Sequence, residues 1–365
     1  MFLYIFYFII SLQVKYMELK MKDIRPIVAA FITIMLIIPA ISLKSDTEVQ
    51  HDDRKYSSMP LEQSLPSLED DTPIGASTQA FKIFKTSTGK VEDIPAVDYI
   101  CGVVAAETPA SYDIEALKAQ AVAAFTYACY HRDYNIAHPG ASVSISGADL
   151  SDDYRHFEAY ISKQQAQSKW GGSFDSNWNK IYSAVIAVKN KVITYGGKPI
   201  DAEFFSLSTG ITESSVNVWG KSLPYLTPVG SAWDKASPEY KSSFKIKQSD
   251  LKTAILAKYK DAKFDKNPSK WLTVKKRSDS GIVLTAELCG KSLGGGDIRS
   301  LFKLRSADFE VSFENGDFTF NVKGNGHDVG MSQYGAEYLA SQGKKWNEIV
   351  SYYYTGVSVS DYIWA

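Results

Sequence analysis

Apolar residues at a helical spacing precede a proline in the first third of the chain. Three apolar positions at i, i+3 and i+7 predict a helix over roughly residues 95–106 with one buried face. These positions are Val97, Ile100 and Val104. Pro109 disfavours the α conformation of the residue before it, so we expect this helix to end near Glu107.

A second helix is predicted directly after this corner. Asp113 is a suitable N-cap, and the helical pattern continues to about Tyr130. An alanine-rich stripe along this helix permits close contact with a neighbouring helix. The stripe consists of Leu117, Ala121, Ala124 and Ala128.

Shorter elements surround these helices. Alternation at residues 81–84, followed by Gly89, predicts a hairpin, and a second hairpin is predicted over residues 192–205 with its turn at Gly196 and Gly197. Apolar spacing predicts a further helix over residues 177–188.

Residues 244–322 have the pattern of a smaller α+β insertion. A helix is expected at 249–259, strands near 281–289 and 309–322, and a flexible turn at Gly294-Gly295-Gly296. The predicted fold class is therefore α+β. We expect an alanine-rich helical core, flanking β-hairpins and small sheets, and a substrate cleft, preceded by one N-terminal transmembrane helix.

The N-terminal part predicts a membrane anchor. Residues 27–43 carry no charge and are just long enough to span a bilayer as a helix. Basic residues in segment 1–26 place that segment in the cytoplasm and the remaining chain outside. A cleaved signal peptide is the alternative. Translation from Met17 or Met21 would make residues 1–16 a mis-called start.

The rest of the chain divides into two parts. Residues 44–78 are polar and rich in turn-forming residues, which predicts a flexible linker. Residues 79–365 are expected to form the extracytoplasmic folded domain, which includes the insertion.

Composition narrows the possible partners. The 40 basic and 41 acidic residues give a formal net charge of −1, which argues against nucleic acid as a partner. Three cysteines lie far apart in apolar or strand-like settings, and no CxxC pair occurs. Buried free thiols are expected rather than a disulfide framework or a zinc knuckle.

Glu107 is a candidate acid because of its position in the last turn of the first predicted helix. The negative end of the helix dipole and the apolar residues 103–106 both disfavour an ionised carboxylate there. A protonated glutamate can donate a proton. An ordinary exposed glutamate at a helix end fits the same pattern, and these features do not decide between the two.

A second candidate site lies in GNGHDVGMSQYGA, residues 324–336. Glycines on both sides of His327 let the backbone approach a partner closely. Ser332 and Gln333 open a predicted helix whose N-terminus presents free amides. His327 is either a functional group in this loop or a hydrogen-bonding residue of a turn.

These motifs resemble those of a known family. AVDYICGVVAAETPASYDIEALKAQAVAAFTYA is similar to the signature of the stage II sporulation protein D family, and residues 324–336 resemble that family's GxGHxVGMSQxGA loop. FFSLSTGITESSVNVWGKSLPYLTPVGSAWD is also similar, and the resemblance extends from about Ala96 to the C-terminus. Members are membrane-anchored peptidoglycan lytic transglycosylases of endospore formers and are related to amidase-enhancer proteins.

The resemblance implies roles for particular residues. Glu107 corresponds to the family's catalytic acid/base, and His327 is implied to share its cleft. Gln120 is either an amide satisfied in the core or a hydrogen-bonding group that faces a sugar. Trp219, Tyr225 and Trp233 either stack on sugar rings or belong to the core. The predicted substrate-binding residues are Gln120, Ser206, Ser208, Thr209, Glu213, His327, Ser332 and Gln333.

The chain departs from the family at several positions. Phe125 stands where the family usually has arginine, and Phe205 where it often has histidine. Some members hold a structural zinc ion with two cysteines and two histidines. Here the cysteine positions match Ser151 and Phe157, while His156 remains and His138 is the candidate for the second histidine. Two histidines do not complete a tetrahedral site, so we expect no zinc, no other metal and no cofactor.

The implied activity is cleavage of MurNAc–GlcNAc bonds in peptide-stripped glycan strands, with 1,6-anhydroMurNAc ends, during sporulation engulfment. One carboxylic acid suffices for this reaction, whereas hydrolysing glycosidases usually need two. A non-catalytic, glycan-binding enhancer of a partner amidase is the alternative. Five histidines without an HExxH motif argue against a metal-dependent amidase or peptidase.

The resemblance also implies partners and a location. Glycan strands, a sporulation amidase and an integral membrane sporulation protein are the implied partners. The domain is expected outside the cytoplasm, on a single-pass anchor in the mother-cell membrane.

The anchor is tested on the protein taken from cells. A retained anchor predicts that N-terminal sequencing and immunoblot sizing find residues 27–43 still attached. A species beginning near Leu43 would show instead that a signal peptide is removed.

Overall fold

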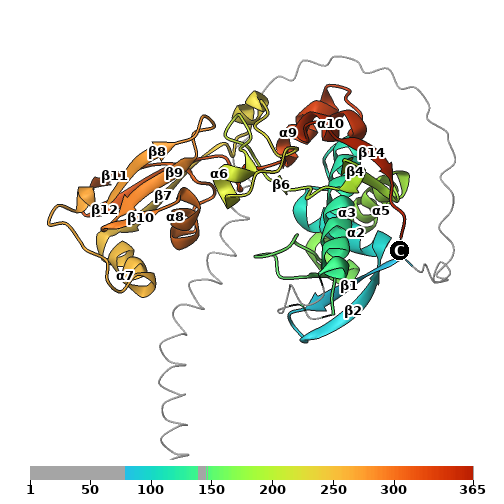
Figure 1. Ribbon diagram of the computed structural model, residues 1–365, viewed down its shortest axis with the longest axis horizontal. Coiled ribbons are helices and arrows are strands. Elements are labelled where there is room, and N and C mark those ends of the chain that lie inside the picture. The colour runs from blue at the N-terminus through green and yellow to red at the C-terminus, as the bar shows by residue number, and fades with distance from the viewer. Residues whose placement is uncertain (1–78, 139–144, 146, 365) are drawn as a thin grey trace, which may run out of the picture. The chain divides into compact units, whose positions relative to one another are not determined.

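The computed structural model describes residues 79–138, 145 and 147–364 (Figure 1). Helices and small sheets are mixed along this part of the chain, which confirms the predicted α+β class. The predicted cytoplasmic segment, membrane span and linker lie outside the described residues. Among the residues that are described, no helix is long and apolar enough to cross a membrane.

Two helices meet at the predicted corner. Helix α2 spans Ala96–Glu107, and Thr108 after it is extended, as the following proline requires. Helix α3 spans Ile114–Ala137 and therefore ends later than the predicted Tyr130. Asp113 caps it, because its side chain accepts a hydrogen bond of 2.7 Å from the Glu115 amide.

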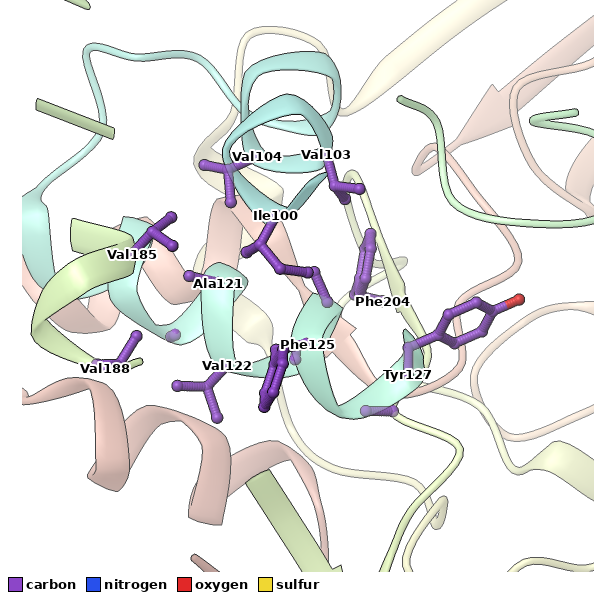
Figure 2. Close-up of a cluster of buried hydrophobic side chains, with 14 of the residues drawn as sticks. Ile100, Val103, Val104, Ala121, Val122, Phe125, Tyr127, Val185, Val188 and Phe204 are labelled. Atoms are coloured by element: carbon purple, nitrogen blue, oxygen red, sulfur yellow. The ribbon is translucent and has the colours of Figure 1, made fainter. Parts of the chain in front are cut away.

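The core lies where α2, α3 and α5 (Phe174–Ala187) pack together. Ile100, Val103 and Val104 of α2 lie near Ala121 and Val122 of α3, and Val185 of α5 belongs to the same cluster (Figure 2). Small side chains on α3 allow these helices to approach closely, as the predicted alanine stripe implies.

Small sheets flank this core. Strands β1 (Ala80–Lys85) and β2 (Lys90–Pro95) form the first predicted hairpin, and β3 (Leu150–Ser151) pairs in parallel with β1. Strand β4 (Lys191–Tyr195) pairs with β5 (Lys198–Pro199) and, on its other edge, with β14 (Ser358–Asp361).

The prediction of one hairpin over residues 192–205 is wrong in its second half. Strand β6 (Phe204–Phe205) pairs in parallel with β13 (Met331–Ser332) and not with β4. A parallel partner must come from a distant part of the chain, so the pairing could not be read from local alternation. It brings residues 204–206 beside the C-terminal motif.

The insertion has a hydrophobic core of its own, which includes Leu251, Phe309 and Phe320. Strand β12 (Asp317–Lys323) pairs with both β7 (Lys241–Lys247) and β11 (Asp308–Glu314), and these strands lie side by side in Figure 1. Strands β8 (Leu272–Arg277), β9 (Val283–Leu288) and β10 (Lys291–Leu293) form a second sheet. Helix α7 spans Gln248–Lys258.

The predicted flexible turn at residues 294–296 is instead the start of a helix. Gly294 is the N-cap of α8 (Gly295–Phe302). A Cβ atom on Gly295 would lie 2.4 Å from the Val283 carbonyl oxygen, so the glycine lets α8 pack directly against β9.

The remaining helices are short. They are α4 (Lys163–Trp170), α6 (Ser215–Trp219), α9 (Gln333–Ser341) and α10 (Trp346–Tyr353), with 3₁₀ turns at Gly171–Ser173, Ala232–Ala236 and Pro268–Lys270.

Gly102 sets how closely α2 approaches the loop that follows β3. A Cβ atom on Gly102 would lie 2.4 Å from the Ile161 carbonyl oxygen and 2.5 Å from the Tyr160 ring. The Ile161 amide donates a hydrogen bond of 3.3 Å to the Gly102 carbonyl oxygen. This contact requires glycine, because any side chain would push the loop away from the helix.

We expect Gly102→Ala to lower the free energy of unfolding by about 1–3 kcal/mol, because the added methyl group overpacks this contact. Urea unfolding followed by circular dichroism measures the change. Gly172→Ala is the matched control, since a Cβ atom there would have no neighbour within 4 Å. Equal stabilities of the two variants would contradict the assigned contact.

Candidate active site

Glu107 is held at the end of α2 by groups from distant parts of the chain. Its Oε1 atom accepts a hydrogen bond of 2.8 Å from the Ala159 amide. Its Oε2 atom accepts one of 3.3 Å from Nε2 of Gln333, the first residue of α9. Lys169 of α4 donates a hydrogen bond of 2.9 Å to the Ala105 carbonyl oxygen at the same helix end.

Glu107 lies between two hollows that together form a cleft. The Pro109 hollow, of about 570 Å³, is lined by Pro109, Lys169 and Tyr334 among others. The His327 hollow, of about 450 Å³, is lined by His327, Glu203 and other residues. Glu107 and Ser206 line both, so a long substrate can pass the carboxyl group with a part in each hollow.

Burial raises the pKa of the Glu107 carboxyl. The Ala159 and Gln333 hydrogen bonds and the positive charge of Lys169 act in the opposite direction, but burial is the larger effect. The site therefore favours a protonated carboxyl group and also contains groups that stabilise its anion. Both properties suit an acid that later acts as a base.

Two further carboxyl groups line the His327 hollow. Glu158 is buried, and neither of its carboxyl oxygens has a hydrogen-bond partner among the described residues. Burial raises its pKa well above the usual value, and the charges of Glu107 and Glu203 act in the same direction. Burial and the neighbouring Asp201 raise the pKa of Glu203 to about 8.

His327 lies beside Glu203, with 3.6 Å between Nε2 and Oε2. Burial and the nearby positive charge of Arg299 lower the pKa of His327 to about 4. With these pKa values both side chains are neutral near pH 7, so the contact is not an ion pair there.

Four of the predicted site residues line the cleft. Glu107, Ser206, Gln333 and His327 come from three separate segments, which the structure brings together. The resemblance implied this for Glu107 and His327. Their mutual position depends on the β6–β13 pairing, which joins the segment of Ser206 to that of Gln333.

Four other predicted residues line neither hollow and form hydrogen bonds within the protein. The Ser208 amide and the Ser332 hydroxyl both donate to Oδ2 of Asp234, at 2.7 and 2.6 Å. The Thr209 hydroxyl donates to Asp328 at 2.8 Å. Glu213 accepts a hydrogen bond of 2.7 Å from Ser280 of the insertion. In this conformation these hydrogen bonds fix the loops to one another. Contact of these residues with substrate stays a prediction.

Gln120 is fully enclosed in α3 and lines neither hollow. Its amide nitrogen and oxygen have no hydrogen-bond partner among the described residues. Neither of the two predicted roles is therefore supported by a contact.

The three predicted aromatic residues lie in different settings. Trp219 is 46% exposed, lines the His327 hollow, and has its ring centroid 5.2 Å from that of His327. Tyr225 is buried, and its hydroxyl accepts from the Asp201 amide. Trp233 stacks on Tyr338 at 5.1 Å and lines neither hollow. Trp219 is thus the one of the three placed to stack on a ligand in the cleft.

Phe125 and Phe205 have different neighbours. Phe125 is buried in α3, lines neither hollow and packs edge to face on Phe81, with centroids 6.0 Å apart. Phe205 lines the His327 hollow, where its ring lies 5.6 Å from that of His327. The replacement by phenylalanine therefore changes the cleft at position 205 and the core at position 125.

The positions that resemble zinc ligands make other contacts. The Ser151 hydroxyl donates to the Phe84 carbonyl oxygen, and the Phe157 ring packs on His131 at 5.7 Å. His156 contacts Asp153, and His138 contacts the Tyr134 carbonyl oxygen. No group of three potential ligands occurs among the described residues. The three cysteines are free and buried, as predicted.

Sequence reasoning missed several charged cleft residues, among them Lys169, Glu158, Glu203 and Arg299. Glu203 directly precedes the segment that resembles the family, and Glu158 directly follows the zinc-like histidine and phenylalanine. Their place in the sequence was a usable signal. Arg299 lies in IRSLFKLRSADF, which also resembles the family, but nothing in that stretch shows that its side chain reaches the cleft. Lys169 has no such signal, because it lies on the exposed side of a short helix.

Comparisons with known proteins identify the family of this chain. A family model described as Stage II sporulation protein matches residues 85–195. A stage II sporulation protein D of Bacillus amyloliquefaciens is 41% identical over 281 residues, which is 76% of this chain and 78% of that protein. The chain belongs to the stage II sporulation protein D family.

Two further relatives extend the comparison. The stage II sporulation protein D of Bacillus subtilis (strain 168) is 34% identical over 345 residues, covering 93% of this chain and 96% of that protein. An amidase enhancer of the same organism is 28% identical over 309 residues, covering 72% of this chain but 40% of that protein. Family membership places the chain in sporulation and confirms the resemblance seen in its motifs.

Gln333→Leu is expected to raise the pKa of Glu107, because it removes a hydrogen bond that stabilises the ionised carboxylate. Carbon-detected NMR of labelled glutamate follows the titration directly. Tyr338→Phe on the same helix is the matched control and should leave the pKa unchanged. An unchanged or lower pKa in Gln333→Leu would contradict this role of the amide.

Proposed function

We propose that this stage II sporulation D protein is a peptidoglycan lytic transglycosylase. Its substrate would be peptide-stripped glycan strands, cleaved between MurNAc and GlcNAc. The observation that carries the proposal is Glu107, a carboxyl group with a raised pKa between two hollows of one cleft.

The chemistry needs one group that first donates and then accepts a proton. Protonated Glu107 donates its proton to the glycosidic oxygen as the C1–O4 bond breaks. Ionised Glu107 then takes the proton of the muramoyl C6 hydroxyl group. At the same time the oxygen of that hydroxyl group forms the new C1–O6 bond. The Ala159 amide, the Gln333 amide and Lys169 stabilise the carboxylate between these steps.

The other carboxyl groups of the cleft argue against hydrolysis. Hydrolysing glycosidases pair the acid with an ionised carboxylate that acts as base or nucleophile. Glu158 and Glu203 are the two candidates in the His327 hollow, and burial raises the pKa of both. The third, Glu239 in the Pro109 hollow, is engaged in an ion pair with Arg305. Neutral carboxylic acids cannot serve in that role, which supports the intramolecular reaction.

The cellular setting follows from the family and from the N-terminal pattern. We propose a single-pass anchor at residues 27–43 and an extracytoplasmic domain that acts on septal wall during engulfment, from the mother-cell membrane. A sporulation amidase that removes stem peptides and an integral membrane sporulation protein are the proposed partners.

A non-catalytic role is the second candidate, because one relative is named an amidase enhancer. In that case the cleft would bind glycan and increase the activity of a partner amidase. The retained Glu107, with its raised pKa, favours catalysis over this alternative.

The decisive experiment incubates the full chain with peptide-stripped strands and identifies the products by mass spectrometry. We expect anhydro-muramoyl products, reduced about 10²–10⁴-fold in Glu107→Gln, because the acid/base group is lost. Glu287→Gln is the matched control, since Glu287 lies on the insertion, pairs with Lys275 and lines neither hollow.

Two outcomes would overturn the proposal. Products released by Glu107→Gln at the wild-type rate would remove Glu107 from the mechanism. No products, together with faster release of peptides by an added cell-wall amidase, would establish the enhancer role instead.

A further inference from the structure

One charged group in the His327 hollow has no role in the proposed reaction. Arg299 lies on α8 of the insertion and lines this hollow. Its Nε atom donates a hydrogen bond of 3.3 Å to the Leu304 carbonyl oxygen, which fixes the base of the guanidinium group. Among the described residues, none forms an ion pair with it or accepts a hydrogen bond from its two terminal nitrogens.

Burial lowers the pKa of Arg299. Removing a guanidinium group from water costs free energy unless an anion pairs with it. Arg299 is partly buried, and among the described residues no anion pairs with it. A ligand anion in the hollow would supply that partner.

The other titratable groups of the hollow do not balance this charge near pH 7. Burial raises the pKa of Glu158 well above its usual value and that of Glu203 to about 8, and it lowers that of His327 to about 4, so these three side chains favour their neutral forms near pH 7. The Glu107 carboxyl accepts its hydrogen bonds from the Ala159 and Gln333 amides. Among the described residues, no carboxylate of the hollow pairs with Arg299.

Arg155 also lines the hollow, but its charge is balanced. Its Nε and Nη2 atoms bond both carboxylate oxygens of Asp153, at 2.7 and 2.6 Å. His156 contacts the same carboxylate. The described part of the hollow thus contains one uncompensated cation, Arg299.

The proposed substrate carries one kind of anion. Hydroxyl and acetamido groups of a peptide-stripped strand are neutral, and the lactyl carboxylate of each muramoyl residue is its ionised group. While a stem peptide is attached, this carboxyl group is an amide and has no charge. A guanidinium group can bind a carboxylate through two parallel hydrogen bonds.

We infer that Arg299 binds the free lactyl carboxylate of a muramoyl residue in the His327 hollow, so that the insertion selects strands from which the stem peptide has been removed. The inference rests on the proposed function for the identity of the substrate. It explains how a cleft can require prior amidase action without any contact to the amidase.

The packing of α8 supports this assignment. Gly295 brings the helix directly against β9, and Arg299 follows one turn later. The insertion is joined to the loops of the main domain by hydrogen bonds from Ser280 to Glu213 and from Thr209 to the Ser280 carbonyl oxygen. The guanidinium group is therefore carried on a regular element and not on a free loop.

Lys169 is the competing cation of the cleft. It lies in the Pro109 hollow, and its ammonium group already donates to the Ala105 carbonyl oxygen. It also lowers the pKa of Glu107. These contacts assign Lys169 to the helix end and the catalytic acid, and the experiment separates the two cations.

Binding is measured with the full chain carrying Glu107→Gln, so that strands are not consumed. Two ligands are compared: peptide-stripped strands, and the same strands after carbodiimide coupling to methylamine, which converts each carboxylate to a neutral amide. We expect about tenfold tighter binding of the carboxylate strands, the usual gain from a charge-assisted pair.

Arg299→Gln in this background should weaken binding of the carboxylate strands about tenfold and leave binding of the amidated strands unchanged. Unchanged binding of the amidated strands also shows that the variant is folded. Arg299→Lys keeps the charge but loses the bidentate hydrogen bonding. It should therefore retain only part of the preference for carboxylate strands over amidated strands. Lys291→Gln is the matched control, because Lys291 of the insertion pairs with Asp261 and neither residue lines a hollow.

Equal binding of the two strand types would overturn the inference, as would a preference that survives Arg299→Gln or is undiminished in Arg299→Lys. Loss of the preference in Lys169→Met, with Arg299→Gln unaffected, would reassign the site to the Pro109 hollow.

Wild-type cleavage separates this inference from the proposed function. Carboxylate-selective binding without anhydro-muramoyl products would leave recognition standing and reject the transglycosylase. Equal cleavage of both strand types would reject recognition and leave the transglycosylase standing.

Discussion

The close approach between α2 and residues 159–161 is the contact on which the candidate site depends. Gly102 allows the Ile161 carbonyl oxygen and the Tyr160 ring to lie directly on the helix. Because the loop lies there, the Ala159 amide reaches the Glu107 carboxyl at 2.8 Å. The same loop carries Glu158 into the wall of the His327 hollow. One backbone contact thereby sets both the hydrogen bonding and the electrostatic surroundings of the acid.

Burial dominates the electrostatics of the cleft. Burial raises the pKa of several carboxyl groups, among them Glu158, whose oxygens have no hydrogen-bond partner among the described residues. Neutral Glu158 and Glu203 in the His327 hollow suit a polymer rich in hydroxyl groups. In the same hollow a guanidinium group gains selectivity for an anion, because among the described residues no carboxylate pairs with Arg299.

The fold was predicted best where a short pattern determines it. Helix α2 and its end at Glu107 follow from apolar spacing and from Pro109, and both are local properties. The pairing of β6 with β13 was missed because it joins residues about 127 positions apart, a separation across which no local pattern acts. The start of α8 was missed because three consecutive glycines in a sequence indicate a turn. The close contact with β9 that requires glycine there is a tertiary contact.

The candidate site also has a part that the sequence predicted and a part that only the tertiary structure showed. The sequence by itself identified Glu107 as the candidate acid, since the motif around Glu107 and the loop around His327 are recognisable without coordinates. Tertiary structure alone decided which predicted residues line the cleft: Ser206 and Gln333 do, while Ser208, Thr209 and Ser332 bond to buried aspartates. The tertiary structure also decided which charged side chains line the cleft without having been predicted, such as Lys169 and Arg299. The physical reason is that burial and pairing depend on neighbours from distant segments, and these set the charge and hydrogen bonding of each group.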